Sequence, residues 1–172
     1  MLPLVSDDGW MLDDSVEDDI DRLMTWFPDA HSIDIWGGPG FRFPFTRHSF
    51  AEDMRWGRMA SFSLRDPSGN FAAFGQLYEK FGCINLARLV ANPDTRGLGV
   101  GRRLVGMLMS VGRPMFTCPK FSLFVFRGNA PALKCYQSMG FNITDYPDEM
   151  PHGDICDYMI RPVAHQEKQG AP

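Results

Sequence analysis

The segment NPDTRGLGVGRRLV, residues 92–105, constrains the fold more than any other part of the 172-residue chain. It places three glycines within five residues, Gly97, Gly99 and Gly101, directly before an apolar series with helical spacing. A glycine-rich turn that opens a helix presents unpaired N–H groups and the positive end of the helix dipole, and together these bind phosphate oxygens. The segment also follows a predicted strand, so we expect a strand, a phosphate-binding turn and a helix in succession.

The spacing of the glycines narrows the type of phosphate ligand. The dinucleotide fingerprint GxGxxG fails because Arg102 stands where its last glycine belongs, and no Gly-Lys pair exists for a GxxxxGK[ST] loop. The pattern [Q/R]xxGx[G/A] does fit, from Arg96 to Gly101. Arg102 and Arg103 fall in the first helical turn, where cations oppose the helix dipole, and a bound polyphosphate accounts for them. The alternative is an ordinary glycine-rich turn with solvated arginines.

The rest of the chain predicts an α/β fold with a mixed (α+β) sheet. Apolar spacing predicts a helix capped by Ser15, a short helix capped by Thr46, a helix after the glycine loop that Pro114 breaks, and a helix over 130–140. Apolar runs predict strands over 59–66, 71–80, 83–93, 120–128 and 154–163. The Gly-, Pro- and aromatic-rich segment 31–46 is expected to be irregular, and 164–172 to be a disordered tail. This order indicates a mixed sheet with helices on its faces.

Composition and charge exclude several functional classes. The length predicts one domain, over 1–163, and the net charge of −4 argues against binding nucleic acid through a general basic surface. No apolar stretch approaches the roughly 18 residues of a membrane span, and the acidic N-terminus lacks the basic region of a secretory signal. The four cysteines are far apart without a CxxC pair, which favours reduced thiols in the cytoplasm over a metal site or disulfides.

Two segments, LARLVANPDTRGLGVGRRLV (86–105) and FVFRGNAPALKCYQSMGF (124–141), together resemble the GNAT superfamily, the Gcn5-related N-acetyltransferases. The resemblance implies the GNAT-like acyl-CoA N-acyltransferase fold, with a central, mostly antiparallel, twisted sheet and helices on both faces. It also implies acetyl-coenzyme A as co-substrate, with its pyrophosphate on the loop amides and its pantetheine arm added beside the preceding strand. The residues assigned to the coenzyme in this way are Leu89, Val90, Ala91, Arg96, Gly97, Leu98, Gly99, Val100, Gly101, Arg102, Asn129 and Tyr136.

The resemblance also implies the chemistry of acetyl transfer. Tyr136 corresponds to the family tyrosine near the thioester sulfur and is the candidate acid that protonates the departing thiolate. With reference pKa values near 10 and 8.5, this transfer is uphill by roughly 2 kcal/mol, so it needs close positioning. A backbone N–H near Val90 would polarise the thioester carbonyl. A core tyrosine and a helix-capping Asn129 are the alternatives for these two side chains.

The general base departs from the family pattern. Some members carry a glutamate where this chain has Asn85, which accepts no proton at neutral pH. Water, Glu79 or His31 is left to take the proton. Deprotonating a lysine-type amine at pH 7 costs about 4.6 kcal/mol and an α-amine about 1 kcal/mol, so an acceptor of low pKa is favoured.

The acceptor pocket is expected on the early helices and the loop between them. The candidate residues are Asp34, Trp36, Phe41, Arg42, Phe43 and Asn85. The alternative is that the aromatic residues among them only cover the sheet.

The sequence therefore predicts an acetyl-CoA-dependent N-acetyltransferase. The acetyl group would pass to a primary amine of a small molecule or peptide N-terminus by direct attack in a ternary complex. A catalytically silent acyl-CoA-binding or sensing domain is the alternative that Asn85 favours, and a module using the loop for ATP or NAD is a third. No metal, nucleic acid or membrane partner is expected, and a homodimer stays open.

Overall fold

The computed structural model describes residues 2–163, so the tail predicted over 164–172 lies outside the described residues. An eight-stranded sheet forms the centre, in the order β1-β2-β3-β4-β5-β6-β8-β7. Neighbouring strands are antiparallel except β5 and β6, which are parallel. The strands are β1 (Leu4–Val5), β2 (Met11–Asp14), β3 (Ala60–Arg65), β4 (Phe71–Lys80), β5 (Cys83–Ala91), β6 (Lys120–Phe126), β7 (Asn142–Thr144) and β8 (Cys156–Pro162).

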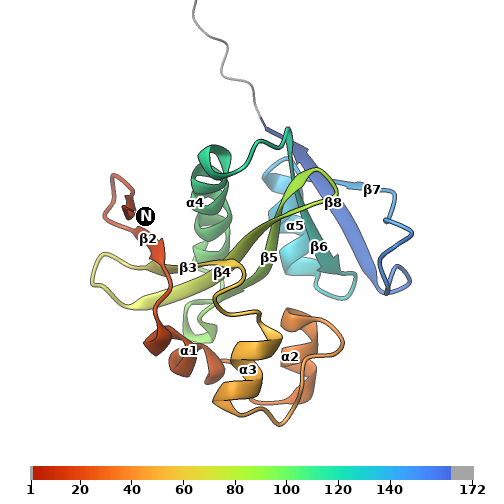
Figure 1. The fold of residues 1–172 in the computed structure, drawn as a ribbon. Coiled ribbons are helices and arrows are strands. Elements are labelled where there is room, and N and C mark those ends of the chain that lie inside the picture. Colours follow the sequence, from red (N-terminus) through yellow and green to blue (C-terminus); the bar gives the residue numbers. More distant parts are fainter. Residues whose placement is uncertain (1, 164–172) are drawn as a thin grey trace, which may run out of the picture.

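Helices lie on both faces of this sheet, and Figure 1 views it from the face that bears the N-terminal helices. Helices α4 (Val100–Met115) and α5 (Ala130–Ser138) pack behind the sheet in this view. Helices α1 (Glu17–Met24), α2 (Ala30–Gly37) and α3 (Arg47–Asp53) lie together on the near side, at its lower end. The predicted mixed, mostly antiparallel sheet with helices on both faces is confirmed.

The main core forms where α4 packs against the sheet. Leu104 and Leu108 of this helix are buried against strands β4 and β5. A side chain at Gly75 of β4 would come within 2.7 Å of Leu108, and one at Gly112 of α4 would come within 3.2 Å of Ile84. These two glycines let the helix lie close to the strands, which fixes the position of the α4 N-terminus.

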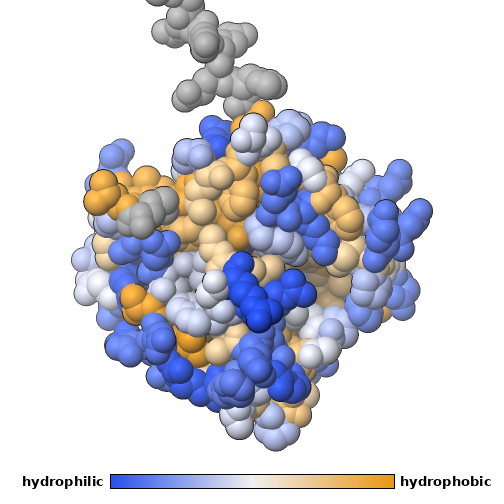
Figure 2. Space-filling view, viewed as in Figure 1, coloured by the Kyte–Doolittle hydropathy of each residue, from blue (hydrophilic) through white to orange (hydrophobic). Residues whose placement is uncertain are grey.

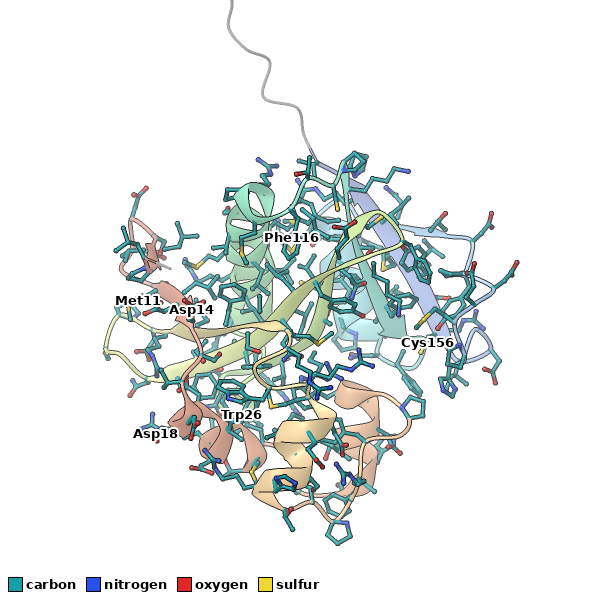
Figure 3. All side chains as sticks on the ribbon, viewed as in Figure 1. Met11, Asp14, Asp18, Trp26, Phe116 and Cys156 are labelled. Atoms are coloured by element: carbon teal, nitrogen blue, oxygen red, sulfur yellow. The ribbon has the colours of Figure 1, made fainter. Side chains whose placement is uncertain are left out.

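An aromatic cluster fills the other face beneath α1–α3. Trp36 of α2 stacks on Phe27 and Phe50, with ring centroids 4.6 and 5.6 Å apart. Trp26, labelled in Figure 3, stacks on Phe71 at the start of β4, at a centroid distance of 4.7 Å. This cluster anchors the three helices to β4 and the end of β5.

Several sequence predictions of local structure were wrong. The segment 31–46, expected to be irregular, begins inside α2, whose N-terminus is capped by the Asp29 carboxylate accepting from the Ser32 N–H at 2.7 Å. The short strands β1, β2 and β7 were not anticipated, because two to four residues carry too little periodicity. Helix α1 begins after Val16 instead of Ser15, and α4 keeps Pro114 in its last turn.

Candidate active site

Strands β5 and β6 separate partway along their length and leave a gap in the sheet. They pair only from Ile84–Leu86 to Phe121–Leu123, although β5 continues to Ala91 and β6 to Phe126. Figure 1 shows the two strands diverging towards the helices α2 and α5. The edge of β5 over residues 87–91 therefore has no neighbouring strand on this side and can pair with an extended ligand. The predicted coenzyme residues Leu89, Val90 and Ala91 lie here.

A β-bulge bends β5 at this point. Phe74 of β4 lies opposite Val90, and Gln76 lies opposite Ala87. An advance of three residues along β5 therefore matches an advance of two residues along β4. Arg88, within the bulge, has a φ of +48°, a left-handed conformation that costs a non-glycine residue energy. The indole of Trp36 donates a hydrogen bond of 2.8 Å to the Arg88 carbonyl and so supports the bulge.

The glycine loop joins the end of β5 to α4 through a short 3-10 turn over Pro93–Thr95. Gly97 and Gly99 have φ values of +80° and +77°, the left-handed region that favours glycine, and Gly99 is the N-cap of α4. Among the described residues, no acceptor lies within hydrogen-bond distance of the main-chain N–H groups of 97 and 99–102. Five free N–H groups at a helix N-terminus can hold a diphosphate.

The arginines beside the loop differ in their contacts. Arg96 is exposed, with no ion pair or hydrogen bond to its side chain among the described residues. Arg102 donates to the Ser138 hydroxyl on α5 at 2.6 Å, which links the two helices beside the gap. Arg103 forms two hydrogen bonds with Asp8, at 2.6 and 2.9 Å, and lies over the Trp10 ring. The expectation that Arg103 requires a polyphosphate was wrong, because the β1–β2 hairpin supplies its partner.

Helix α5 follows β6 and carries two predicted residues, of which Tyr136 packs against the main core. Asn129 is its N-cap, and its side-chain oxygen accepts from the Ala132 N–H at 3.4 Å. Tyr136 packs on Phe141 edge to face, and its hydroxyl makes no hydrogen bond within the described residues. Burial strongly raises the pKa of Tyr136, so this hydroxyl keeps its proton throughout the neutral range.

A model of the acetyltransferase (GNAT) family matches residues 21–141, well over half of the chain. The chain belongs to this family. The family match confirms the enzyme class predicted from the sequence, an N-acetyltransferase. The match spans the gap, the glycine loop and α5.

Solved structures share the fold of this GNAT enzyme. The spermidine N-acetyltransferase of Vibrio cholerae, bound to CoA and spermine, has a TM-score of 0.70 at 15% identity, covering 90% of this chain and 95% of its own. The ribosomal-protein-S18-alanine N-acetyltransferase of Escherichia coli gives a TM-score of 0.64 at 21% identity, covering 94% and 99%. An aminoglycoside acetyltransferase bound to coenzyme A gives 0.68 at 20% identity, covering 89% and 94%.

The predicted acceptor residues of the GNAT enzyme are divided between its core and its surface. Trp36 and Phe41 belong to the aromatic cluster, and Phe41 is buried. The Arg42 guanidinium is bonded to Asp53 and Glu52 on α3, at 2.7 and 2.8 Å, so the structure does not bring it to the gap. Phe43 and Asp34 are exposed, and Phe43 packs edge to face on Phe45. That contact pattern could not be read from the sequence.

Asn85 lies on the sheet face that bears α1–α3, where it is buried and accepts from the Ser122 hydroxyl at 3.1 Å. Of the two alternatives for the base, Glu79 pairs with Ile84, whose side chain packs towards α4, so Glu79 is on the opposite face of the sheet. His31 is exposed on α2 near Asp29. Glu79 therefore cannot replace the missing glutamate on the face that carries Asn85.

Sequence reasoning missed three residues on this face: Tyr78, Lys80 and Arg88. Tyr78 and Lys80 follow Gln76 at every second position of β4, and this alternation of polar residues was the available signal. The Arg88 guanidinium donates to the Gln76 side chain at 2.8 Å and to the Asp53 carbonyl at 2.9 Å. Its Nε atom is buried without a partner among the described residues. Burial lowers the pKa of Arg88.

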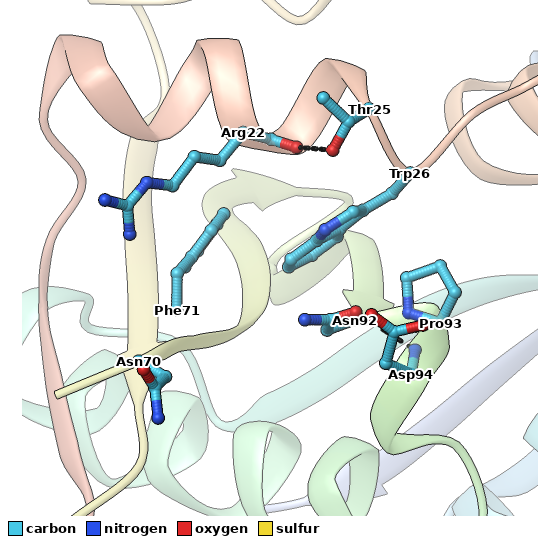
Figure 4. A pocket seen from close by; sticks show the side chains of 8 residues that line it. All are labelled: Arg22, Thr25, Trp26, Asn70, Phe71, Asn92, Pro93 and Asp94. Atoms are coloured by element: carbon cyan, nitrogen blue, oxygen red, sulfur yellow. Dashed lines mark hydrogen bonds between the residues drawn. The ribbon is translucent and has the colours of Figure 1, made fainter. Parts of the chain in front are cut away.

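A cavity of about 420 Å³ lies next to the glycine loop (Figure 4). The stacked rings of Trp26 and Phe71 form one wall, and Asn92, Pro93 and Asp94, at the end of β5, form another. The Asn92 side chain already accepts from the Asp94 N–H at 3.0 Å. None of the predicted site residues lines this cavity.

Among residues 2–163, no three His, Cys, Asp or Glu side chains are grouped so that they could hold a metal ion. The same part of the chain contains no helix with the length and apolar character needed to span a membrane.

Proposed function

We propose that this GNAT enzyme transfers an acetyl group from acetyl-coenzyme A to a primary amine by direct attack in a ternary complex. The observation that carries the proposal is the alignment of the five free N–H groups of the glycine loop with the unpaired edge of β5. A diphosphate on the loop directs the attached pantetheine arm along Leu89–Ala91, towards the point where β5 and β6 separate.

The residues at that point can support the chemical step. A thioester in the gap would meet main-chain N–H groups of the bulged β5 on one side and the Tyr136 hydroxyl on the other. The N–H groups, near Val90, stabilise the oxyanion that forms when the amine attacks the carbonyl carbon. The C–S bond then breaks, and the Tyr136 hydroxyl donates a hydrogen bond or its proton to the departing sulfur.

Removal of the proton from the attacking amine does not require a carboxylate base in this proposal. Water carries the proton away, and the amine must be neutral when it attacks. Loss of that proton is easiest for an amine of low pKa, which the surroundings of the bound acceptor can provide.

The buried, bonded Asn85 is the observation that favours the alternative, a silent acyl-CoA-binding domain. The experiment that separates the two measures thiol release from acetyl-CoA with a panel of amines. Amine-dependent release, with acetylated product by mass spectrometry, supports the transferase. Tight coenzyme binding without release above background supports the binding domain.

We further propose that the enzyme works in the cytoplasm, as the widely spaced cysteines suggest. All four are unpaired in the structure. A possible homodimer can be tested by light scattering on the purified chain.

A further inference from the structure

The acceptor side of the gap lies on the near face, beside α1–α3 (Figure 1). Its floor consists of polar and aromatic side chains from four adjacent strands, which cross-strand pairing places on one face: Tyr78, Asn85, Ser122, Phe124 and Tyr158. Asn85, Ser122 and Tyr158 are buried, and Tyr146 packs on Phe124, so a second substrate would meet the partly exposed Tyr78 and Lys80 at the edge of this floor.

Lys80 extends from β4 across this floor. Its ammonium nitrogen lies 5.9 Å from the centre of the Phe124 ring on β6, 6.0 Å from Tyr78 and 5.3 Å from Phe81. Strand β5 lies between β4 and β6, so the ammonium group is above β5, near Asn85. Among the described residues no carboxylate lies within ion-pair distance of Lys80. The Lys80 ammonium group is therefore stabilised by cation–π contacts with these three rings.

Two arginines add to the positive charge at this position. Arg88 donates to a side-chain amide, a thioether and a carbonyl, with no hydrogen bond to a carboxylate among the described residues. Arg55 follows α3 and is exposed, near Lys80 and Arg88. Figure 2 shows a strongly hydrophilic patch at the centre of this face. Burial and the nearby Arg55 lower the pKa of Lys80. Three cations therefore share one region of the acceptor side.

Two carboxylates near this region are engaged elsewhere. Asp53 is bonded to Arg42 at 2.7 Å, and Asp157 to Arg127 at 2.8 Å. The hydrogen bond from Asp157, with a smaller contribution from Asp154, raises the pKa of Arg127. Among residues 2–163, neither Lys80 nor Arg55 forms an ion pair with a carboxylate.

We propose that the acceptor of this enzyme is a small amine that also carries a carboxylate, such as an amino acid or short peptide, with the carboxylate bound by Lys80 and Arg55. This inference rests on the proposed function and specifies its substrate. A carboxylate satisfies the unpaired ammonium and guanidinium groups. A polyamine such as spermidine would place further positive charge among three cations.

The same cations explain how the enzyme works without a carboxylate base. A like charge nearby disfavours the protonated form of the bound acceptor amine and lowers its pKa. The carboxylate of the acceptor provides the binding energy that keeps the amine in this positive environment. The carboxylate of the acceptor therefore provides the binding, and the amine of the same acceptor is the group that loses its proton.

The test compares amines that differ only by a carboxylate. The purified chain is assayed for thiol release with phenylalanine against phenethylamine, lysine against cadaverine, and with spermidine. We expect kcat/KM to be at least tenfold higher for the carboxylated member of a pair. Lys80→Met, which keeps the aliphatic stem, should lower kcat/KM at least tenfold for that member and less than twofold for its partner.

The matched control is Arg113→Met, which removes an exposed charge in the last turn of α4. This variant should leave kcat/KM unchanged for both members of each pair. Thermal unfolding of Lys80→Met and Arg113→Met tests whether the two variants fold. Equal rates within the pairs, or a preference for spermidine and cadaverine, would overturn the inference while leaving the acetyltransferase intact. Coenzyme binding with no thiol release from any of the amines would instead overturn the proposed function, and this inference with it.

Discussion

The indole Nε1 of Trp36 donates a 2.8 Å hydrogen bond to the main-chain carbonyl of Arg88, at the bulge where β5 leaves β6. This bond connects the aromatic cluster under α1–α3 to the strand edge that we assign to the pantetheine arm. The bulge holds a non-glycine residue in a left-handed conformation, so it depends on such supports from its surroundings.

Trp36→Phe removes this hydrogen bond while keeping an aromatic ring in the cluster. We expect a loss of about 1 kcal/mol of stability and a several-fold lower kcat, because the β5 edge is less firmly positioned. The control is Trp26→Phe, whose indole stacks on Phe71 without a hydrogen bond from its nitrogen among the described residues. It should lose stability and keep its kcat; a similar fall in kcat for both variants would contradict this role for Trp36.

Gly99 and Gly101 provide a matched pair within the loop. Alanine at Gly99 must adopt a φ near +77°, at a cost of about 1–2 kcal/mol, so we expect weaker coenzyme binding. Gly101 is helical with open space where its Cβ would lie, and alanine there should bind coenzyme as before and stabilise α4 by up to about 1 kcal/mol. Isothermal titration with coenzyme A measures both. Equal affinities would show that the loop conformation does not matter.

Tyr136→Phe tests the proposed acid. The variant should lose roughly 100-fold in kcat and less than twofold in coenzyme affinity, because the hydroxyl acts when the C–S bond breaks. Tyr146→Phe is the control, since the Tyr146 hydroxyl donates to the Pro151 carbonyl at 2.9 Å in the segment before β8. Unchanged turnover in Tyr136→Phe would remove this residue from the proton path.

The pH dependence of the reaction follows from the same residue. The raised pKa of Tyr136 keeps the hydroxyl protonated to above pH 10, so the acid is not lost in the usual range. For an amine without a carboxylate, such as phenethylamine, kcat/KM should therefore rise with pH as the amine loses its proton, without a falling limb below about pH 10. A bell-shaped profile with a decline near pH 8 would indicate a different acid.

The parts of the site that could be predicted from the sequence are those that local pattern determines. The glycine loop is one, because Gly97 and Gly99 supply a backbone conformation that other residues avoid. Helix α5 with its N-cap Asn129 is another. The acceptor side was missed because the bulge at Arg88 breaks the alternation of β5, and because Phe124, which completes the aromatic environment of Lys80, comes from the distant strand β6. Such long-range contacts have no local signal.

Helix α2 shows how a local signal was present but outweighed. Asp29 and Ser32 form a capping pattern, yet Gly37, Gly38 and Gly40 made the following segment look irregular. The helix ends at Gly37, where a side chain would lie 2.2 Å from the Phe41 ring. These glycines let the chain turn back over the aromatic cluster.

Amide hydrogen exchange with and without coenzyme A tests the central claim most directly. The account predicts that saturating coenzyme A slows exchange in peptides covering residues 97–102 and 87–91, because the free N–H groups of the loop and of the β5 edge acquire acceptors. Unchanged exchange in the loop, with protection appearing at another helix N-terminus or in the cavity beside Trp26, would contradict it.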